Sequence, residues 1–264
     1  MHTITSPANQ IIKDLLRLKK SGNRRDLGLV LVDGEREIEV AIKSGWEIDR
    51  LYFCQELAGK EEFLGVNDNI IISVPTAIFQ KISYKENPDG YLAVFKLKQD
   101  KGVMPDSSGN PLFIVLENVE KPGNIGAIIR TAAAVGARGI IINDNQTDIY
   151  NPNVIRSSEG EVFSQTIVVR SRLETVSWLK KSGIVCLAAA TNASKNYTDL
   201  DLSGPIAVIL GSEAEGLSQE WQDEADFKIK IPMSGNIDSL NVSVAAAVIS
   251  FEAKRQRENK QDKS

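Results

Sequence analysis

The stretch LFIVLENVEKPGNIGAIIRTAAAVGARGIII, residues 112–142, has the pattern of a strand, a turn, a helix and a second strand. Its two ends, FIVL and GIII, are short unbroken apolar runs, as expected for strands buried on both faces of a sheet. Between them, a Pro-Gly-Asn turn leads into an alanine-rich segment of helical length. This order predicts two parallel strands joined by a crossover helix.

The same alternation continues toward the C-terminus. Further strands are predicted, with helical stretches between them, at Thr166–Val169, Ile184–Ala188, Ile206–Leu210 and Phe227–Ile231. The pattern predicts a mostly parallel sheet covered by helices on both faces.

A smaller alternating α/β unit precedes this sheet. Ser6 and Pro7 predict the cap and first position of an amphipathic helix. Helices are expected near 35–44 and 75–82, and short strands at Leu29–Val32, Ile48–Phe53, Ile70–Val74 and Tyr91–Leu97. Residues 99–110 concentrate Gly, Pro, Asp, Ser and Asn, as a linker does. The sequence therefore predicts two domains, residues 1–98 and 111–264.

Composition excludes several kinds of chemistry. The cysteines, Cys54 and Cys186, lie far apart without a C-x-x-C pair, so a disulfide framework, a zinc ribbon and a dithiol site lack their residues. The single histidine, His2, stands at the N-terminus, which excludes imidazole-based catalysis. We expect no metal site. The chain also has no apolar run of membrane length and no signal sequence, so we expect a cytoplasmic protein without a membrane segment.

The net charge of the chain is -4 and its pI is near 5.3. These values argue against a protein that simply coats nucleic acid. The average hides a positive run close to the N-terminus, formed by Lys13, Arg17, Lys19, Lys20, Arg24 and Arg25. A solvated helix face explains such a run as well as a phosphate contact does.

Ligands of open α/β sheets bind at the carboxyl ends of the strands, and three segments there are unusual. The first is ENVEKPGNIGAIIRTAAAVGA, residues 117–137, which has G-x-x-G rather than the dinucleotide pattern G-x-G-x-x-G. Asn124 is predicted at the helix N-cap, and Arg130 follows within two turns, so both could face one site. A capping Asn and a solvent-facing Arg explain the segment equally well.

The second segment, VILGSEAEGLS at residues 208–218, has the outline of a phosphate-binding loop without its lysine. Leu217 takes the place of the lysine, and Glu213 and Glu215 add negative charge, so a polyphosphate would be repelled. Such a loop suits a cationic or hydroxyl-rich ligand, although a plain acidic turn is as consistent with the local pattern.

The third segment, residues 231–259, begins IPMSGNIDSLNVS and enters a long Ala- and Val-rich helix near Asp238 or Ser239. Ser239 and Asn241 bring short polar side chains to the helix start, where backbone N–H groups are free. Taken alone, this segment favours a capped core helix.

Together and in this order, the three segments resemble the signature motifs of the SpoU (TrmH-like) branch of the SPOUT RNA methyltransferases. The matching stretches are P-x-N-x-G-A-I-x-R at 122–130, L-G-x-E-x-x-G-L at 210–217 and I-P-M-x-G-x-x-x-S-L-N-V-S at 231–243. Residues 31–53 and 88–95 are similar to the RNA substrate-binding domain that precedes the catalytic domain in many members.

The resemblance implies a small N-terminal α/β RNA-binding domain followed by an α/β methyltransferase domain with a trefoil knot. It further implies S-adenosylmethionine as cofactor, a homodimer, and methyl transfer to a ribose 2′-hydroxyl of ribosomal RNA, with transfer RNA less favoured. A cationic sulfonium fits an acidic, lysine-free loop, and methyl transfer to oxygen needs neither metal nor histidine.

Site residues follow from the same resemblance. The expected catalytic positions are Arg130, Asn124, Glu213, Ser239 and Asn241. The expected lining of the cofactor pocket is Thr191, Leu210, Gly211, Ile231, Met233 and Leu240. Arg130 and Arg156 are expected to contact the RNA, Arg130 through a phosphate and the forming alkoxide rather than as a simple base.

Two other classes compete with this interpretation. An RNA-binding or ribosome-assembly factor of the same fold that has lost catalysis would retain the architecture, but every polar motif position is filled here. A nucleotide-dependent dehydrogenase or kinase lacks both its glycine pattern and its phosphate-binding lysine.

Overall fold

A computed structural model describes residues 1–59, 65–98, 102–143, 148–234 and 238–261. The chain divides into two compact units, the first formed by residues 1–99 and 148–164 and the second by 100–147 and 165–264. The sequence-based ranges 1–98, 99–110 and 111–264 stay a prediction, and residues 99–101 of the expected linker lie outside the described residues. The segment 148–164 belongs to the first unit by its contacts, although it interrupts the sequence of the second.

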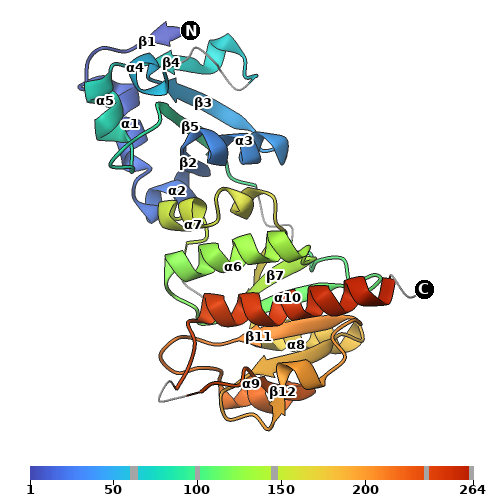
Figure 1. The fold of residues 1–264 in the computed structure, drawn as a ribbon. Coiled ribbons are helices and arrows are strands. Elements are labelled where there is room, and N and C mark those ends of the chain that lie inside the picture. The colour runs from blue at the N-terminus through green and yellow to red at the C-terminus, as the bar shows by residue number, and fades with distance from the viewer. Residues whose placement is uncertain (60–64, 99–101, 144–147, 235–237, 262–264) are drawn as a thin grey trace. The chain divides into compact units, whose positions relative to one another are not determined.

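The second unit is built on a seven-stranded sheet in the order β10-β12-β9-β11-β6-β7-β8 (Figure 1). Its strands are β6 Leu112–Glu117, β7 Gly139–Asn143, β8 Ile167–Arg170, β9 Val185–Ala189, β10 Lys195–Asn196, β11 Ile206–Leu210 and β12 Phe227–Lys230. All neighbouring pairs are parallel, which confirms the predicted sheet. The two residues of β10 are too few and too polar to give a strand pattern in the sequence.

Helices cover both faces of this sheet. Helices α8 Arg172–Lys181 and α9 Gln219–Glu224 lie on one face, where Val176 and Trp221 join a core with strand residues such as Phe113. Helices α6 Pro122–Val135 and α10 Val242–Gln261 pack against each other on the opposite face (Figure 1). The short 3-10 helix η3 Tyr197–Asp199 follows β10.

Helices α6 and α10 begin at other residues than predicted. Asn124 lies inside the first turn of α6 rather than at its N-cap, because Pro122 takes the first position and Lys121 precedes it. Proline suits that position, where no backbone N–H is needed. Helix α10 starts at Val242, not near Asp238, and the Asn241 side chain accepts a hydrogen bond from the Ser243 N–H at 2.9 Å.

The first unit contains a five-stranded mixed sheet in the order β1-β4-β3-β5-β2. The strands are β1 His2–Thr3, β2 Leu29–Asp33, β3 Ile48–Phe53, β4 Ile71–Ser73 and β5 Tyr91–Lys96, with β5 antiparallel to both neighbours. The helices are α1 Gln10–Arg17, α2 Ser21–Leu27, α3 Glu35–Lys43, α4 Gln55–Ala58 and α5 Thr76–Ile82, with the 3-10 helix η1 Asp68–Ile70. Ile12, Leu15 and Phe79 belong to its core.

Helix α1 starts at Gln10, so the prediction of a start at Ser6 and Pro7 is wrong. The side chain of Asn9 accepts a hydrogen bond from the Ile11 N–H at 2.9 Å and caps the helix. Ser6 instead closes a turn, since its carbonyl accepts from the Asn9 N–H. Both residues are favourable caps, and only the turn geometry distinguishes them.

The segment 148–164 contains helix α7 Pro152–Ser157 and the 3-10 helix η2 Glu161–Phe163. Asp148 forms an ion pair with the buried Arg24, and the Trp46 indole N–H donates to the Phe163 carbonyl at 2.9 Å. Gly160 has φ +84° and approaches helix α3 so closely that a Cβ would lie 3.0 Å from the Cα of Glu37. The segment is thus fastened to the first unit by an ion pair, a buried hydrogen bond and close backbone packing.

Among the described helices, none is long and apolar enough to cross a membrane. The trefoil knot implied by the family resemblance stays a prediction.

Candidate active site

A cavity of about 360 Å³ lies at the carboxyl edge of the parallel sheet in the second unit. The ends of β9, β11 and β12 and the start of α10 surround it. The cavity brings together all the residues that the sequence predicted for cofactor binding, namely Thr191, Leu210, Gly211, Ile231, Met233 and Leu240. Segments far apart in the sequence therefore meet at the sheet edge where ligands of such folds bind.

The loop after β11 forms one wall of this cavity. Ser212 and Gly216 pair through two backbone hydrogen bonds, of 3.1 and 3.0 Å, which fold the loop back on itself. A Cβ on Gly211 would lie 2.1 Å from the carbonyl carbon of Gly216. Only glycine allows this close approach of two backbone segments.

Acidic side chains dominate the charge of the cavity. Glu213, Glu215 and Asp238 line it together with one cation, Lys230. The two glutamates were identified from the sequence, but Asp238 was placed only at a helix start. The local sequence around Asp238 does not show that the fold brings this residue to the same cavity as the loop after β11. A cavity with excess carboxylate favours a positively charged ligand.

A short chain of amide and carboxylate groups connects the three motifs. The Asn241 side-chain amide donates to the Asn124 Oδ1 at 3.2 Å, and the Asn124 amide donates to a carboxylate oxygen of Glu213. Ser239 also lines the cavity. These four predicted catalytic positions therefore lie in one place, although they come from three separate motifs.

The predicted RNA contacts lie elsewhere. Arg130 is on the exposed surface of α6, six residues beyond Asn124, and does not line the cavity. Arg156 lies on α7 in the first unit, not in the unit that carries the cavity. Residues 235–237 of the third motif lie outside the described residues.

Glu117 is a site-supporting residue that sequence reasoning missed. Its carboxylate is buried at the end of β6 and accepts hydrogen bonds from the Ser218 N–H at 2.8 Å and the Ser218 hydroxyl at 2.7 Å. Ser218 in turn caps helix α9. This arrangement fixes the loop after β11 to the first motif. The one sequence feature that could have indicated Glu117 is its position as an acidic residue at the end of an apolar strand.

Comparison with known proteins agrees with this geometry. Residues 111–251 match the model of the SpoU rRNA Methylase family, and residues 9–93 match that of the MRM3-like substrate binding domain. The chain is 32% identical to the 23S rRNA (uridine(2479)-2′-O)-methyltransferase of Streptomyces viridochromogenes, over 91% of this chain and 87% of that protein.

Two solved structures have the same fold over nearly the whole chain. An RNA 2′-O ribose methyltransferase superposes with a TM-score of 0.85 at 34% identity, covering 97% of this chain and 99% of the other. An AdoMet-bound rRNA methyltransferase from Sinorhizobium meliloti gives 0.83 at 29% identity, covering 96% and 97%. The chain belongs to the SpoU rRNA methylase family, which confirms the family resemblance and the predicted fold class.

S-adenosylmethionine is the cofactor of this family, and the cavity fits it. Its sulfonium and ammonium charges match the carboxylates of Glu213, Glu215 and Asp238, and its adenine suits the apolar side chains of Leu240 and Ile249. In the part of the chain that the structure describes, no group of His, Cys, Asp and Glu side chains could hold a metal ion.

Proposed function

We propose that this enzyme transfers a methyl group from S-adenosylmethionine to a ribose 2′-hydroxyl of ribosomal RNA, with transfer RNA as a less favoured substrate. The observation that carries the proposal is the convergence of all three motifs on one acidic cavity at the sheet edge. The relatives named above are ribosomal RNA and ribose 2′-O methyltransferases, which supports the same reaction.

When bound, S-adenosylmethionine supplies a methyl group on a positively charged sulfur. The acceptor 2′-oxygen forms a bond to the methyl carbon as the carbon–sulfur bond breaks, and the hydroxyl proton is released to solvent. Charge cancels along this path, so orientation and exclusion of water supply much of the rate. The hydrogen bonds from Asn241 to Asn124 and from Asn124 to Glu213 orient the Glu213 side chain, which lines the cavity.

A labelled methyl transfer assay tests the proposal. The full-length protein is incubated with labelled S-adenosylmethionine and with separated ribosomal and transfer RNA, and the product is hydrolysed with alkali. We expect label in ribosomal RNA that resists alkaline cleavage, because a 2′-O-methyl group blocks attack of that oxygen on the neighbouring phosphate. Cofactor binding without label in either RNA pool or in ribosomal particles would instead favour the inactive RNA-binding alternative.

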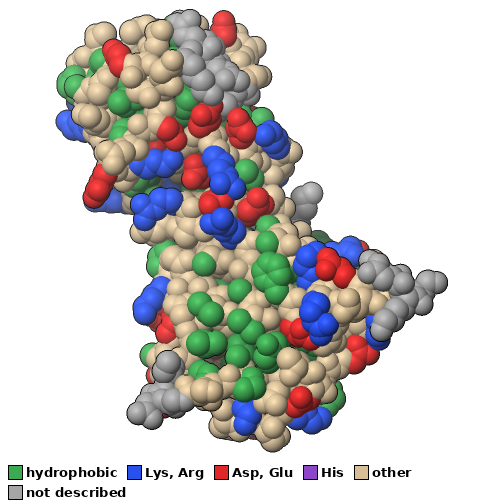
Figure 2. All heavy atoms as spheres, in the orientation of Figure 1, with side chains coloured by type: hydrophobic (Ala, Val, Ile, Leu, Met, Phe, Trp, Pro, Cys, Tyr) green, Lys and Arg blue, Asp and Glu red, His purple; other side chains and the backbone are tan. Residues whose placement is uncertain are grey.

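A homodimer formed through α10 is part of this proposal. Val244 is 46% exposed and Phe251 is 47% exposed, and their seven-residue spacing places them on one side of the helix. Figure 2 shows hydrophobic side chains gathered over this part of the second unit. Exposed apolar patches of this kind mark interaction surfaces.

A charge on this stripe should dissociate the dimer. For the double variant Val244→Glu, Phe251→Glu we expect at least a ~100-fold weaker association, since burying an unpaired charge costs about 3–5 kcal/mol. Light scattering after size exclusion gives the mass. The matched control is Leu173→Glu on α8, an equally apolar residue that is 71% exposed. A wild-type monomer, or a dimer that survives the double change, contradicts the prediction.

We also propose that the enzyme works in the cytoplasm, because its relatives modify ribosomal RNA. The lack of a membrane-crossing helix among the described residues is consistent with this location.

A further inference from the structure

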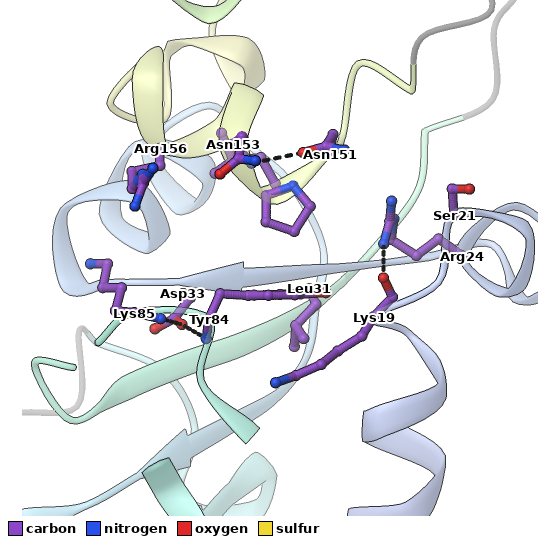
Figure 3. Close-up of a pocket in the computed structure, with 12 residues that line it drawn as sticks. Lys19, Ser21, Arg24, Leu31, Asp33, Tyr84, Lys85, Asn151, Asn153 and Arg156 are labelled. Carbon is purple, nitrogen blue, oxygen red and sulfur yellow. Dashed lines mark hydrogen bonds between the residues drawn. The ribbon is translucent and has the colours of Figure 1, made fainter. Parts of the chain in front are cut away.

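A second cavity, of about 390 Å³, lies entirely within the first unit (Figure 3). Helix α7 and its N-cap Asn151 form one side, with Asn153 and Arg156, and the end of β2 and the segment after α5 form another with Asp33, Tyr84 and Lys85. Its volume falls in the range of roughly 300–1,000 Å³ typical of small-molecule sites. Nothing in the methyl transfer described above uses it.

Asp33 carries the first argument for a ligand. The residue is only 9% exposed, and its Oδ2 accepts hydrogen bonds from the Ser83 hydroxyl at 2.7 Å, the Tyr84 N–H at 2.6 Å and the Lys85 N–H at 3.3 Å. Its Oδ1 is buried and has no hydrogen-bond partner among the described residues. A buried carboxylate oxygen without a donor is costly, so this atom calls for an N–H or O–H group from a ligand.

Tyr84 stands beside Asp33 on the same wall. Arg24 lies within hydrogen-bonding reach of its buried hydroxyl oxygen, and the O–H itself has no acceptor among the described residues. Burial raises the pKa of this phenol to about 12, against the opposing effect of the nearby Arg24, so the hydroxyl stays protonated and can donate. The wall therefore offers one acceptor and one donor close together.

Arg156 carries the second argument. The other cations of the cavity are engaged: Arg24 pairs with Asp148, Lys85 with Asp89 at 3.1 Å, and the Lys19 ammonium donates to the Ser83 carbonyl at 2.8 Å. Arg156 is exposed, and no ion pair or side-chain hydrogen bond to another described residue involves its guanidinium. Arg156 is thus an exposed cation of this lining that can bind an anion.

The negative charge of Asp33 and the positive charge of Arg156 together restrict the chemical class of the ligand. Free phosphate would bring no N–H donor to the buried Oδ1 of Asp33, and a simple cation would be repelled by Arg156. A nucleotide satisfies both, because its base presents N–H groups and its phosphate is anionic. RNA-binding proteins commonly read unstacked bases in this way. The cavity also joins residues matched by the substrate-binding model to residues matched by the methylase model.

We infer that this cavity binds one unstacked nucleotide of the RNA substrate, with a base amino group donating to Asp33, an acceptor atom of the same base on the Tyr84 hydroxyl and a phosphate on Arg156. The assignment to RNA rests on the proposed function, whereas the affinity for a nucleotide does not. The segment 148–164 thus supplies part of an RNA-reading site on the first unit.

The direct test measures binding of the four nucleoside 5′-monophosphates to the full-length protein by NMR or calorimetry. We expect at least one amino-bearing nucleotide among AMP, GMP and CMP to bind more tightly than UMP. In Asp33→Asn the amide oxygen can accept the same three hydrogen bonds and turn an N–H toward the cavity. This change should weaken amino-bearing nucleotides by about tenfold and favour UMP in relative terms.

Arg156→Ala should weaken binding of all four nucleotides by about fivefold or more. The matched control is Arg25→Ala, which removes an exposed arginine of α2 that does not line the cavity. Absence of binding to the wild type at about 10 mM, or equal losses in both arginine variants, would overturn the inference. Unfolding midpoints and S-adenosylmethionine affinity, measured on each variant, exclude misfolding as the cause.

Methylation of ribosomal RNA separates this inference from the proposed function. We expect Arg156→Ala to raise the KM for RNA with a smaller effect on kcat. Nucleotide binding without any RNA methylation would contradict the proposed function and leave the site standing. Methylation that proceeds with an unchanged KM in Arg156→Ala would reject the site as part of RNA reading and leave the proposed function intact.

Discussion

Gly211→Ala should weaken S-adenosylmethionine binding by about 10- to 100-fold, because forcing an added methyl group into packed structure costs about 1–3 kcal/mol. The new Cβ would lie 2.1 Å from the Gly216 carbonyl carbon and 2.3 Å from the Leu217 nitrogen. Both contacts are backbone, so the clash cannot be relieved by rotating a side chain. The loop must move, and that loop forms a wall of the cofactor cavity. Calorimetry with S-adenosylmethionine measures the effect.

Gly204→Ala is the matched control for this prediction. Gly204 belongs to the same unit, and an added Cβ would meet no atom within 4 Å. Its cofactor affinity and its unfolding midpoint should equal those of the wild type. Unchanged affinity in Gly211→Ala would show that the loop after β11 is not part of the cofactor site.

The parallel sheet was predictable because its strands are buried on both faces. Runs such as IAVIL at 206–210 are apolar at every position, and the structure makes all of Ile206–Leu210 a fully buried strand. The two-residue strands β1 and β10 carry no such pattern, since so short an element is defined by its neighbour rather than by its own residues. The start of helix α1 was predicted wrongly because Ser6 and Asn9 are both favourable caps, and the local sequence does not distinguish them.

The cavity at the sheet edge was predictable through the family motifs, because Gly211, Met233 and Leu240 all line it. Their contacts with the cofactor stay a prediction. Contacts formed only by the tertiary fold were not predictable from the sequence. The hydrogen bonds from Ser218 to Glu117 join residues 101 positions apart, and neither side chain signals its partner. Asp238 was likewise missed as a cavity residue.

The unit to which Arg156 belongs also depends on tertiary contacts that local sequence does not show. The sequence continues from β7 through residues 148–164 to β8, so a reading along the chain assigns α7 to the methyltransferase domain. The contacts of Asp148, Gly160 and Phe163 instead hold this segment in the first unit. Local sequence propensity does not show that a chain leaves one unit and later returns to it.

Arg130→Lys should lower the rate of RNA methylation by about 100-fold and leave S-adenosylmethionine affinity unchanged. Arg130 is exposed on α6 and does not line the cavity that we assign to the cofactor, so the change should leave that cavity intact. A guanidinium offers several donors in a planar fork, which can hold a phosphate and the developing 2′-alkoxide together, whereas an ammonium is a point charge. Losing one such donor to a transition state typically costs about 10²–10³ in rate.

The matched control for this prediction is Arg138→Lys, which changes an exposed arginine of the same unit that pairs with Asp106 at 2.8 Å. Single-turnover methylation of ribosomal RNA should separate the two variants, because Arg138 lies beyond the end of α6 and outside the cavity lining. If Arg130→Lys keeps the wild-type rate, the fork is not required, and a positive charge alone is sufficient at this position. If its cofactor affinity falls as far as its rate, Arg130 acts on the cofactor cavity and not on the acceptor.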